Sequence, residues 1–414
     1  MTGRTHVDDS KGWRSAWQLF RTLTGLLRTV WLMLGGCVLV LVTLELLMTA
    51  FRKTQASAGD GRAYADGYHG APWVKEYFRE LARSDTYRWE PYVYWRHTPL
   101  HGAYIHVNER GLRETTCGEL DRHARAPEER LTIWVFGGSA IWGFGARDEH
   151  TIPSELCRSV AQAMNRRVEV VNFGETGYIS TQEVIALLRE LQRGQRPDLV
   201  VFCDGTNDTF AAFRNKTAGI PYGESNRTDA FKILNAAWNA DIRTVLSLFL
   251  SRSEIRRFVP RLARSPYESM EAIDQERELP TDVSQRLATA VMQVYAANVR
   301  FVETLSRQSG FVALFYWQPV IFTKRHLTAY EQQRAEEHRA RRAFFLQVHE
   351  QMKRHPDLAP NERFYDLTPL FAETKEPYFI DSLHVTETGN ALVAKQMAAD
   401  ISRVFHAPER SRLP

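Results

Sequence analysis

Near the carboxyl end of the chain an aspartate stands three residues before a histidine, in the run Asp381-Ser-Leu-His384. Residues three apart in a turn lie on the same side, so we expect the Asp381 carboxylate to fix the tautomer of the His384 ring. The other ring nitrogen could then take a proton from a hydroxyl group. Such a pair serves as general base and orienting acid in nucleophilic catalysis, and it requires a nucleophile from another part of the chain.

Three earlier loops supply the missing parts of such a site. Ser139 follows two glycines in Gly137-Gly-Ser139, a tight turn in which its hydroxyl would be exposed. Gly177 lies in the next loop, where its backbone N–H could reach a developing oxyanion, and Asn207 in the third loop could aim its side-chain amide at the same place. Each feature alone is more often an ordinary turn or a helix cap. Their combination indicates acyl transfer through a serine, because each loop follows a predicted strand.

From residue 131 onward, apolar β-branched runs alternate with helical segments. The expected strands span residues 131–137, 168–174, 198–205, 311–319 and 363–371, with helices at 151–165, 181–193 and 389–405. Alternation of this kind builds a parallel sheet covered on both faces, here a three-layer α/β/α sandwich with five parallel strands. Ligands of such sheets bind beyond the carboxyl ends of the strands, where the chemically interesting loops lie.

The order Ser, Gly, Asn and Asp-x-x-His resembles the sequence blocks of the SGNH/GDSL hydrolase family. The resemblance runs from about Leu131 to Phe405, with the exception of residues 211–290. It implies an SGNH-type, flavodoxin-like fold and a serine esterase that needs no metal or organic cofactor. One position departs from the family pattern, since Gly138 stands where the family usually has the aspartate of Gly-Asp-Ser.

The resemblance also assigns roles to individual residues. It implies a catalytic triad of Ser139, Asp381 and His384. It further implies an oxyanion hole formed by the backbone N–H groups of Ser139 and Gly177 together with the side-chain amide of Asn207.

Three more residues are candidates for binding the substrate because they stand beside the predicted site. Trp142 and Tyr178 closely follow the serine and the oxyanion glycine, and Gln318 ends the fourth predicted strand. A packing role is the alternative, because aromatic side chains more often pack than recognise ligands and Pro319 would stop the strand in any case.

Residues 29–51 form an almost wholly apolar run, long enough as a helix to span a hydrocarbon core of about 30 Å. Basic residues lie on both sides of it: Arg4, Lys11, Arg14, Arg21 and Arg28 before, and Arg52, Lys53 and Arg62 after. Their bias predicts a single-pass helix with residues 1–28 in the cytoplasm and the rest outside. A cleaved signal peptide is the alternative, since Ala56-Ser57-Ala58 resembles a cleavage site. An apolar helix followed by Asn-x-x-Gly-Leu-Arg (108–113) also resembles a membrane-tethered bacterial branch of the family.

Two regions do not follow the strand–helix alternation. Residues 52–130 are polar, aromatic-rich and weakly periodic, which favours a juxtamembrane stalk packed on a hydrolase domain at 131–406. Residues 211–290 are long for a connection between core strands, and a short helical piece is expected at 236–250. They are interpreted either as a cap beside the active site or as a surface insertion with no catalytic part.

Composition limits the other functions. The 414 residues carry a net charge of +4 and are 44% hydrophobic, as in folded proteins, and the absence of a basic stripe interleaved with aromatics argues against nucleic-acid binding. The four cysteines have no C-x-x-C spacing, which argues against a zinc or thioredoxin-like site. Cys117 and Cys157 could form a disulfide, although the number of cysteines does not require one.

The predicted function is hydrolysis of O-acyl groups on an extracytoplasmic substrate such as an acylated glycan or lipid. An O-acyltransferase acting on an extracellular polysaccharide would use the same acyl-serine intermediate and is the first alternative. A non-catalytic envelope scaffold or glycan-binding protein is the second, although it would not need the full set of triad and oxyanion residues. The fold and the triad do not determine the acyl or alcohol group.

Overall fold

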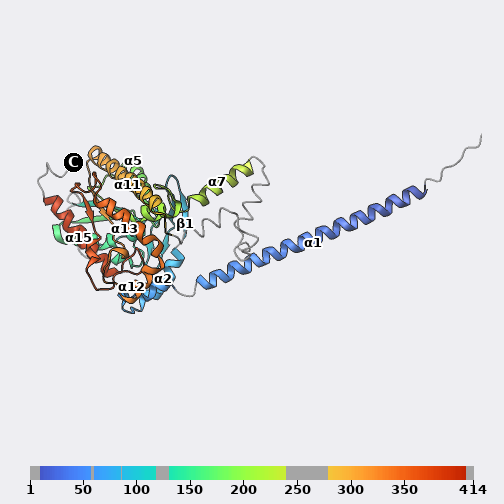
Figure 1. Ribbon diagram of the computed structural model, residues 1–414, viewed down its shortest axis with the longest axis horizontal. Helices are drawn as coiled ribbons and strands as arrows, with labels where there is room; N and C mark the ends of the chain where they lie inside the picture. The colour runs from blue at the N-terminus through green and yellow to red at the C-terminus, as the bar shows by residue number, and fades with distance from the viewer. Residues whose placement is uncertain (1–9, 57–59, 85, 118–129, 239–277, 407–414) are drawn as a thin grey trace, which may run out of the picture. The chain divides into compact units, whose positions relative to one another are not determined.

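The computed structural model describes residues 10–56, 60–84, 86–117, 130–238 and 278–406 of the chain. Two compact units can be distinguished, and each is described by itself. The first contains the long N-terminal helix, and the second, Gly59–Thr228 with Met270–Pro414, contains the sheet and every predicted site residue. Figure 1 follows the chain by colour through both units.

Helix α1 (Ser10–Ala56) belongs to the first unit. Its segment Phe20–Met48 is long and apolar enough to cross a membrane, judged by length and composition. This segment begins and ends earlier than the predicted span of 29–51. A signal sequence near an N-terminus would have the same character, so the membrane span itself stays a prediction.

Five parallel strands form the main sheet of the second unit, in the order β6-β5-β7-β8-β9. The strands are β5 (Leu131–Gly137), β6 (Val168–Asn172), β7 (Leu199–Asp204), β8 (Val312–Trp317) and β9 (Phe364–Asp366). Every residue of β7 and β8 is buried, as expected for continuous apolar runs in a covered parallel sheet. The predicted α/β/α fold class is confirmed, and all five strands fall inside the predicted ranges.

The strand order fixes where a site can form. The chain runs from β5 outward to β6 and then crosses back to β7 on the other side of β5. In open parallel sheets the carboxyl ends of the strands at such a topological switch point are where ligands bind. Ser139 follows β5 and Asn207 follows β7, so the switch point brings these two residues to the same edge.

Two helical layers cover the sheet, and side chains of each strand alternate between them. The main helices are α4 (Ile152–Met164), α5 (Ser180–Gln192), α11 (Thr281–Ser309) and α15 (Glu387–His406). Ile133 and Val135 of β5 lie in the core cluster of α4 and α15. Trp134 and Phe136 lie in the cluster of α5 and α11. Figure 1 shows α5 and α11 together and α15 apart from them.

The described chain contains further helices and 3₁₀ turns. The helices are α3 (Ser139–Trp142), α6 (Thr206–Asn215), α7 (Glu224–Trp238), α12 (Ala329–Glu337), α13 (Arg339–Lys353) and α14 (Pro369–Ala372). The 3₁₀ turns are η1 (Gly61–Tyr64), η2 (Asp66–Tyr68), η5 (Asp148–His150) and η6 (Ile321–Thr323).

The region 211–290 is not one insertion, which corrects the predicted boundaries. Helix α6 buries Ala212 and Phe213 in the core, and α11 begins at Thr281, so both ends of the region belong to the domain itself. The polar outer faces of these helices hide this in the sequence. Residues 239–277, with most of the expected helical piece at 236–250, lie outside the described residues, and a cap stays a prediction.

Residues 60–117 contain more regular structure than their weak periodicity predicts. They form α2 (Trp73–Ser84), a hairpin of β1 (Tyr87–Glu90) and β2 (Tyr94–His97), and a short hairpin of β3 (Leu100–His101) and β4 (His106–Val107). The apolar face of α2 packs in a cluster with Trp142 and Ile380. These two residues lie in the serine loop and beside the triad aspartate, so the segment supports both loops.

A disulfide joins Cys117 to Cys157 of α4, with 5.2 Å between the two Cα atoms. The bond spans a sequence separation of 40 and encloses β5 and Ser139 in the loop that it closes. The other two cysteines are free: Cys203 is buried and Cys37 is exposed. The disulfide therefore ties the end of residues 60–117 to the helix that covers the nucleophile strand.

Replacing both Cys117 and Cys157 by serine is expected to lower the free energy of unfolding by about 4 kcal/mol, because the unfolded chain regains the entropy of a loop of this length. Urea unfolding of the detergent-solubilised chain, followed by tryptophan fluorescence, measures the change. Cys37→Ser removes an exposed thiol and is the control that should leave the midpoint unchanged. Equal midpoints for the double variant and the wild type would contradict a stabilising disulfide.

Candidate active site

Ser139 begins α3, directly after the carboxyl end of β5. The two glycines before it leave no room for side chains. A Cβ atom at Gly137 would lie 2.5 Å from the carbonyl oxygen of Cys203, and one at Gly138 would lie 2.2 Å from Nδ2 of Asn207. Glycine at position 138 therefore lets the Asn207 amide approach the nucleophile loop closely.

His384 and Asp381 form a hydrogen-bonded series with Ser139. Ser139 Oγ lies 2.6 Å from Nε2 of His384, and Nδ1 of His384 lies 2.8 Å from Oδ2 of Asp381. The other carboxylate oxygen of Asp381 accepts the backbone N–H groups of Leu383 and His384, both at 2.8 Å. The structure thus brings together the three residues predicted as a triad, in the geometry that general-base activation of a serine requires.

Asp381 is held as a carboxylate. Burial alone would raise its pKa, but the His384 ring, the hydrogen bonds from that ring and from the Leu383 backbone, and the charge of Arg62 together lower the pKa of Asp381 well below its usual range. A carboxylate that stays ionised at neutral pH favours a proton on Nδ1 of His384. Nε2 then remains the proton acceptor that faces Ser139.

Arg62 is a charged neighbour of the triad that sequence reasoning missed. Its Nη1 lies 3.5 Å from Oδ2 of Asp381, and Asp60 holds the same guanidinium through Nη2 at 2.6 Å. The guanidinium also lies over the ring of Phe144 at 4.4 Å, and Phe144 stacks on His384 at 4.5 Å. An isolated arginine 319 positions before its partner carries no sequence signal, so only the fold reveals the contact.

The three expected oxyanion donors have N–H groups that a substrate could use. Nδ2 of Asn207 donates one hydrogen to the carbonyl of Tyr178 at 2.7 Å, which orients the amide and leaves its second N–H. Gly177 has a φ of +74°, a conformation that favours glycine, and no described residue accepts its N–H. Ser139 is the first residue of α3, a position whose N–H has no acceptor within the helix.

The three residues predicted to line a substrate pocket are all buried. Trp142 is completely enclosed and stacks on the ring of His97 at 4.5 Å. The Tyr178 hydroxyl donates to a backbone carbonyl of β2, and Nε2 of Gln318 donates to the carbonyl of Leu383 at 2.8 Å. All three are placed to support the catalytic loops, and their burial leaves little surface for a substrate.

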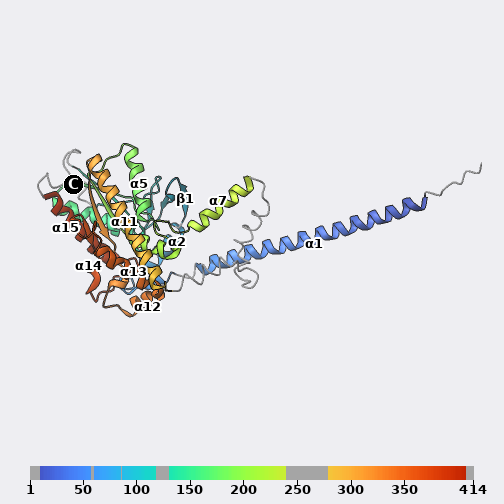
Figure 2. The same cartoon turned by 45° about the horizontal axis from the view of Figure 1, so that its top comes forward.

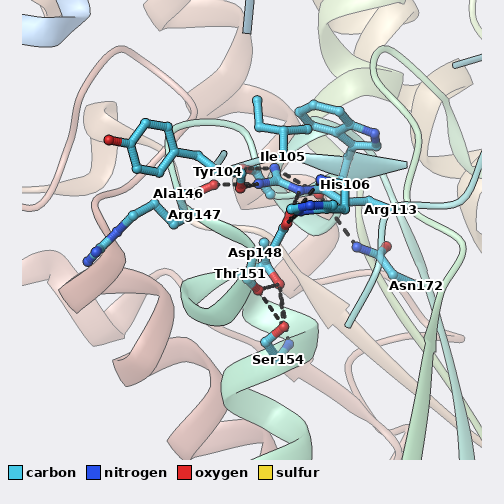
Figure 3. Close-up of polar contacts among 12 residues, drawn as sticks. Tyr104, Ile105, His106, Arg113, Ala146, Arg147, Asp148, Thr151, Ser154 and Asn172 are labelled. Carbon is cyan, nitrogen blue, oxygen red and sulfur yellow. Dashed lines mark hydrogen bonds and ion pairs between the residues drawn. The ribbon is translucent and has the colours of Figure 1, made fainter. Parts of the chain in front are cut away.

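Arg113 ends the Asn-x-x-Gly-Leu-Arg segment and organises the loop that follows α3. Its buried guanidinium donates to the Asp148 carboxylate at 2.8 Å and to the carbonyls of Gly143 and Ala146 at 2.6 and 2.7 Å. Figure 3 shows Asp148 and Ala146 beside the Arg113 guanidinium. Because the carbonyls of the loop are drawn inward, the path of the chain that leaves Ser139 is fixed.

Buried acids anchor the turn that presents Asn207. Burial raises the pKa of Asp204, at the end of β7, to about 7, and it also raises the pKa values of Asp208 and Glu183. Asp208 accepts hydrogen bonds from the hydroxyl and backbone N–H of Ser180, at 2.6 and 3.0 Å.

Within the described part of the chain, no group of three or more His, Cys, Asp or Glu side chains is arranged to hold a metal ion.

The family model of GDSL-like lipases and acylhydrolases matches residues 133–397. The chain belongs to this family. As a GDSL-type acylhydrolase it is an enzyme that hydrolyses ester bonds, and its five-stranded parallel sheet agrees with the family fold. The comparison with curated protein sequences gives no match.

Solved structures similar to this GDSL acylhydrolase include an acetyl xylan esterase, at 13% identity and a TM-score of 0.36 over 66% of this chain and 100% of that one. A lipase from a goat rumen metagenome matches at 11% identity and a TM-score of 0.37, over 65% and 97%. An acetylxylan esterase from Geobacillus stearothermophilus matches at 13% identity and a TM-score of 0.33, over 66% and 94%. At such TM-scores these likenesses say nothing about the substrate of this chain.

Gly138→Ala is expected to lower kcat by about 10²–10³-fold, the typical cost of losing an oxyanion donor, because the new Cβ would displace the Asn207 amide. Asn207→Ala should lower kcat by a similar factor. Since both changes act on the same donor, the double variant should be no slower than Asn207→Ala. Steady-state hydrolysis of an aryl acetate gives kcat for the two single variants and the double variant. Fully additive losses in the double variant would contradict the idea that both changes act through the Asn207 amide.

Arg62→Met is expected to move the acid limb of the kcat/KM profile to higher pH, because the charge of Arg62 helps to lower the pKa of Asp381 and its removal lets that carboxylate take up a proton more easily. The ionised Asp381 carboxylate orients His384 and stabilises its imidazolium, so easier protonation of Asp381 costs activity at low pH. Tyr330 and His338 interact electrostatically with Asp381 and stay unchanged in the variant.

Arg62→Lys keeps the positive charge and is the matched control for this experiment. It should retain the wild-type pH profile even if kcat falls. A loss of activity in Arg62→Met that is equal at every pH would instead assign Arg62 a purely structural role.

Proposed function

We propose that this chain is a membrane-anchored serine esterase that removes O-acyl groups from an extracytoplasmic glycan or lipid through an acyl-serine intermediate. The observation that carries the proposal is the unbroken series from Ser139 Oγ through His384 to Asp381, with donor–acceptor distances of 2.6 and 2.8 Å. This series supports Ser139 as the nucleophile, His384 as the general base and Asp381 as the residue that orients it.

In the first half-reaction, Nε2 of His384 takes the hydroxyl proton as Ser139 Oγ attacks the ester carbonyl carbon. The carbonyl oxygen becomes an oxyanion and accepts hydrogen bonds from the backbone N–H groups of Ser139 and Gly177 and from the Asn207 amide. The Asp381 carboxylate stabilises the imidazolium. When the tetrahedral intermediate collapses, the alcohol leaves with the proton from His384, and the acyl group stays on Ser139.

Water completes the cycle in the second half-reaction. His384 takes a proton from the water as its oxygen attacks the acyl carbonyl, and the same three donors hold the second oxyanion. Ser139 Oγ then leaves and takes the proton back from His384, and the carboxylic acid is released. Asp381 remains a carboxylate throughout, which agrees with the direction of its pKa shift.

Two features support an extracytoplasmic location for the second unit. Five basic residues precede the predicted span of 29–51 and three follow it closely, which favours a cytoplasmic N-terminus. The disulfide between Cys117 and Cys157 favours an oxidising compartment such as the periplasm or the cell exterior. Acylated glycans and envelope lipids are the ester substrates that we propose for this location.

The proposal is tested by turnover of p-nitrophenyl acetate by the detergent-solubilised chain. Hydrolysis should fall by at least about 10³-fold in Ser139→Ala and in His384→Ala, and a fluorophosphonate probe should label the wild type but not Ser139→Ala. His349→Ala is the matched control, since His349 pairs with Asp366 at 2.9 Å outside the triad and should keep full activity.

Two outcomes would change the assignment. Turnover that persists in Ser139→Ala, or a folded wild type that neither hydrolyses the ester nor reacts with the probe, would contradict the proposed nucleophile. With a sugar acceptor present, acyl transfer to the sugar in preference to water would assign an acyltransferase instead of an esterase.

A further inference from the structure

Five arginines line one cavity of the second unit. The cavity has a volume of about 390 Å³ and is bordered by the β1–β2 hairpin, the 109–112 turn and helix α5. Figure 2 shows β1 beside α5. Its charged lining consists of Arg88, Arg96, Arg110, Arg189 and Arg193 with Glu90, Glu109 and Glu190. Five positive against three negative side chains leave an excess of two positive charges.

Arg96 is the buried member of this set. It is only 7% exposed, and its Nη1 atom has no hydrogen-bond partner among the described residues. The described carboxylates include none in an ion pair with Arg96, whose guanidinium lies over the ring of Tyr178 at 5.9 Å. A buried charge without a counter-ion destabilises a fold strongly, so this arginine is expected to have an anionic partner that the chain does not supply.

The register of the β1–β2 hairpin places a second arginine beside Arg96. Arg96 in β2 stands directly opposite Arg88 in β1, and like charges in this position repel. Nη1 of Arg88 donates to the backbone carbonyl of Glu109 at 2.9 Å, which does not neutralise the guanidinium. Two guanidinium groups that have no acidic partner among the described residues therefore border the cavity.

The other arginines of the lining already have acidic partners. Glu190 pairs with Arg110 at 2.6 Å and also with Arg193, and Glu90 pairs with Arg189 at 2.5 Å. Glu109 is the remaining acid, and it is exposed. The excess charge is therefore concentrated on Arg88 and Arg96.

Gly111 holds Arg96 in this position. Its φ is +77°, and a Cβ atom there would lie 2.6 Å from Cγ of Arg96. The aliphatic stem of Arg96 thus packs directly on the turn of the Asn-x-x-Gly-Leu-Arg segment. Because the stem is confined, the guanidinium is fixed at the cavity and does not reach free solvent.

We propose that this cavity is a binding site for an anionic group, a phosphate or a carboxylate, with Arg96 and Arg88 as its ligands. The planar guanidinium presents paired N–H donors that match two oxygens of either group. The group belongs either to a free anion or to an acidic polymer such as a uronate polysaccharide. The site is separate from the triad and adjoins Tyr178, whose carbonyl orients Asn207.

The test is thermal unfolding of the detergent-solubilised chain with inorganic phosphate or with oligogalacturonate, each compared with sodium chloride at equal ionic strength. A ligand that binds only the folded state should raise Tm in a saturable way. A rise in Tm with phosphate alone would indicate that the site binds a free anion, and a rise with oligogalacturonate alone would indicate an acidic polymer. A wild type that shows no saturable rise with either probe would overturn the proposal.

Variants distinguish binding from general screening. Arg96→Met should abolish the rise in Tm and should not lower Tm in anion-free buffer, because it removes an unpaired buried charge. Arg193→Met, at a half-exposed arginine paired with Glu190, is the matched control and should keep the rise.

An unchanged rise in Arg96→Met would also overturn the proposal. If that variant does not fold, the role of Arg96 is structural, and Arg88→Met decides the matter by weakening the apparent Kd at least about tenfold or leaving it unaltered. Ser139→Ala should bind the anion as the wild type does, so failure of the esterase assignment would not affect this result.

Discussion

The buried guanidinium of Arg113 is the constraint on which the nucleophile side of the site depends. Its face lies over Trp142 at 4.6 Å, and Trp142 in turn stacks on His97. Nδ1 of His97 bonds the buried carboxylate of Glu175 at 2.5 Å, and that carboxylate accepts the N–H of Thr176, directly before the oxyanion glycine. One series of polar and aromatic contacts therefore links the loop of the serine to the loop of the oxyanion glycine. Because a buried cation must keep its partners, neither loop can move independently, which is the preorganisation that catalysis of acyl transfer exploits.

The histidine side of the site is fixed in a similar manner. Lys324 and Glu331 form a completely buried ion pair at 2.6 Å. Oε1 of Glu331 also accepts the backbone N–H of Phe379, and Nζ of Lys324 donates to the carbonyl of Glu376. This pair holds the approach to Asp381, as Arg113 holds the exit from the serine. Both halves of the site are thus fixed by buried charged side chains that also bond the backbone. Removing one residue of such an ion pair would destabilise the fold, because the other charge would stay buried without a partner.

The sequence predicts the fold and the chemistry of the loops for physical reasons that act locally. A strand that is buried on both faces has a continuous run of apolar residues, and Asp381 and His384 are only three residues apart. Both patterns are local and can therefore be recognised in a single sequence. Contacts between distant segments leave no such trace, which is why the approach of Arg62 to Asp381 and the unpaired state of Arg96 emerge only from the fold. The burial of Trp142 could not be predicted, because proximity in sequence to a nucleophile does not tell whether an aromatic ring faces outward or is stacked in the core.

The contact of Arg62 with the triad has a consequence for any release of the enzyme from its N-terminal helix. Helix α1 ends at Ala56, and the surroundings of the triad begin at Asp60, which holds the Arg62 guanidinium. A protease that cuts between these two points would shed an enzyme with its active site intact. A cut after Arg62 would release an enzyme in which Asp381 has lost its contact with the Arg62 guanidinium. The connection between helix and catalytic unit is therefore too short to be trimmed freely, and the position of the cut would decide which form of the enzyme is set free.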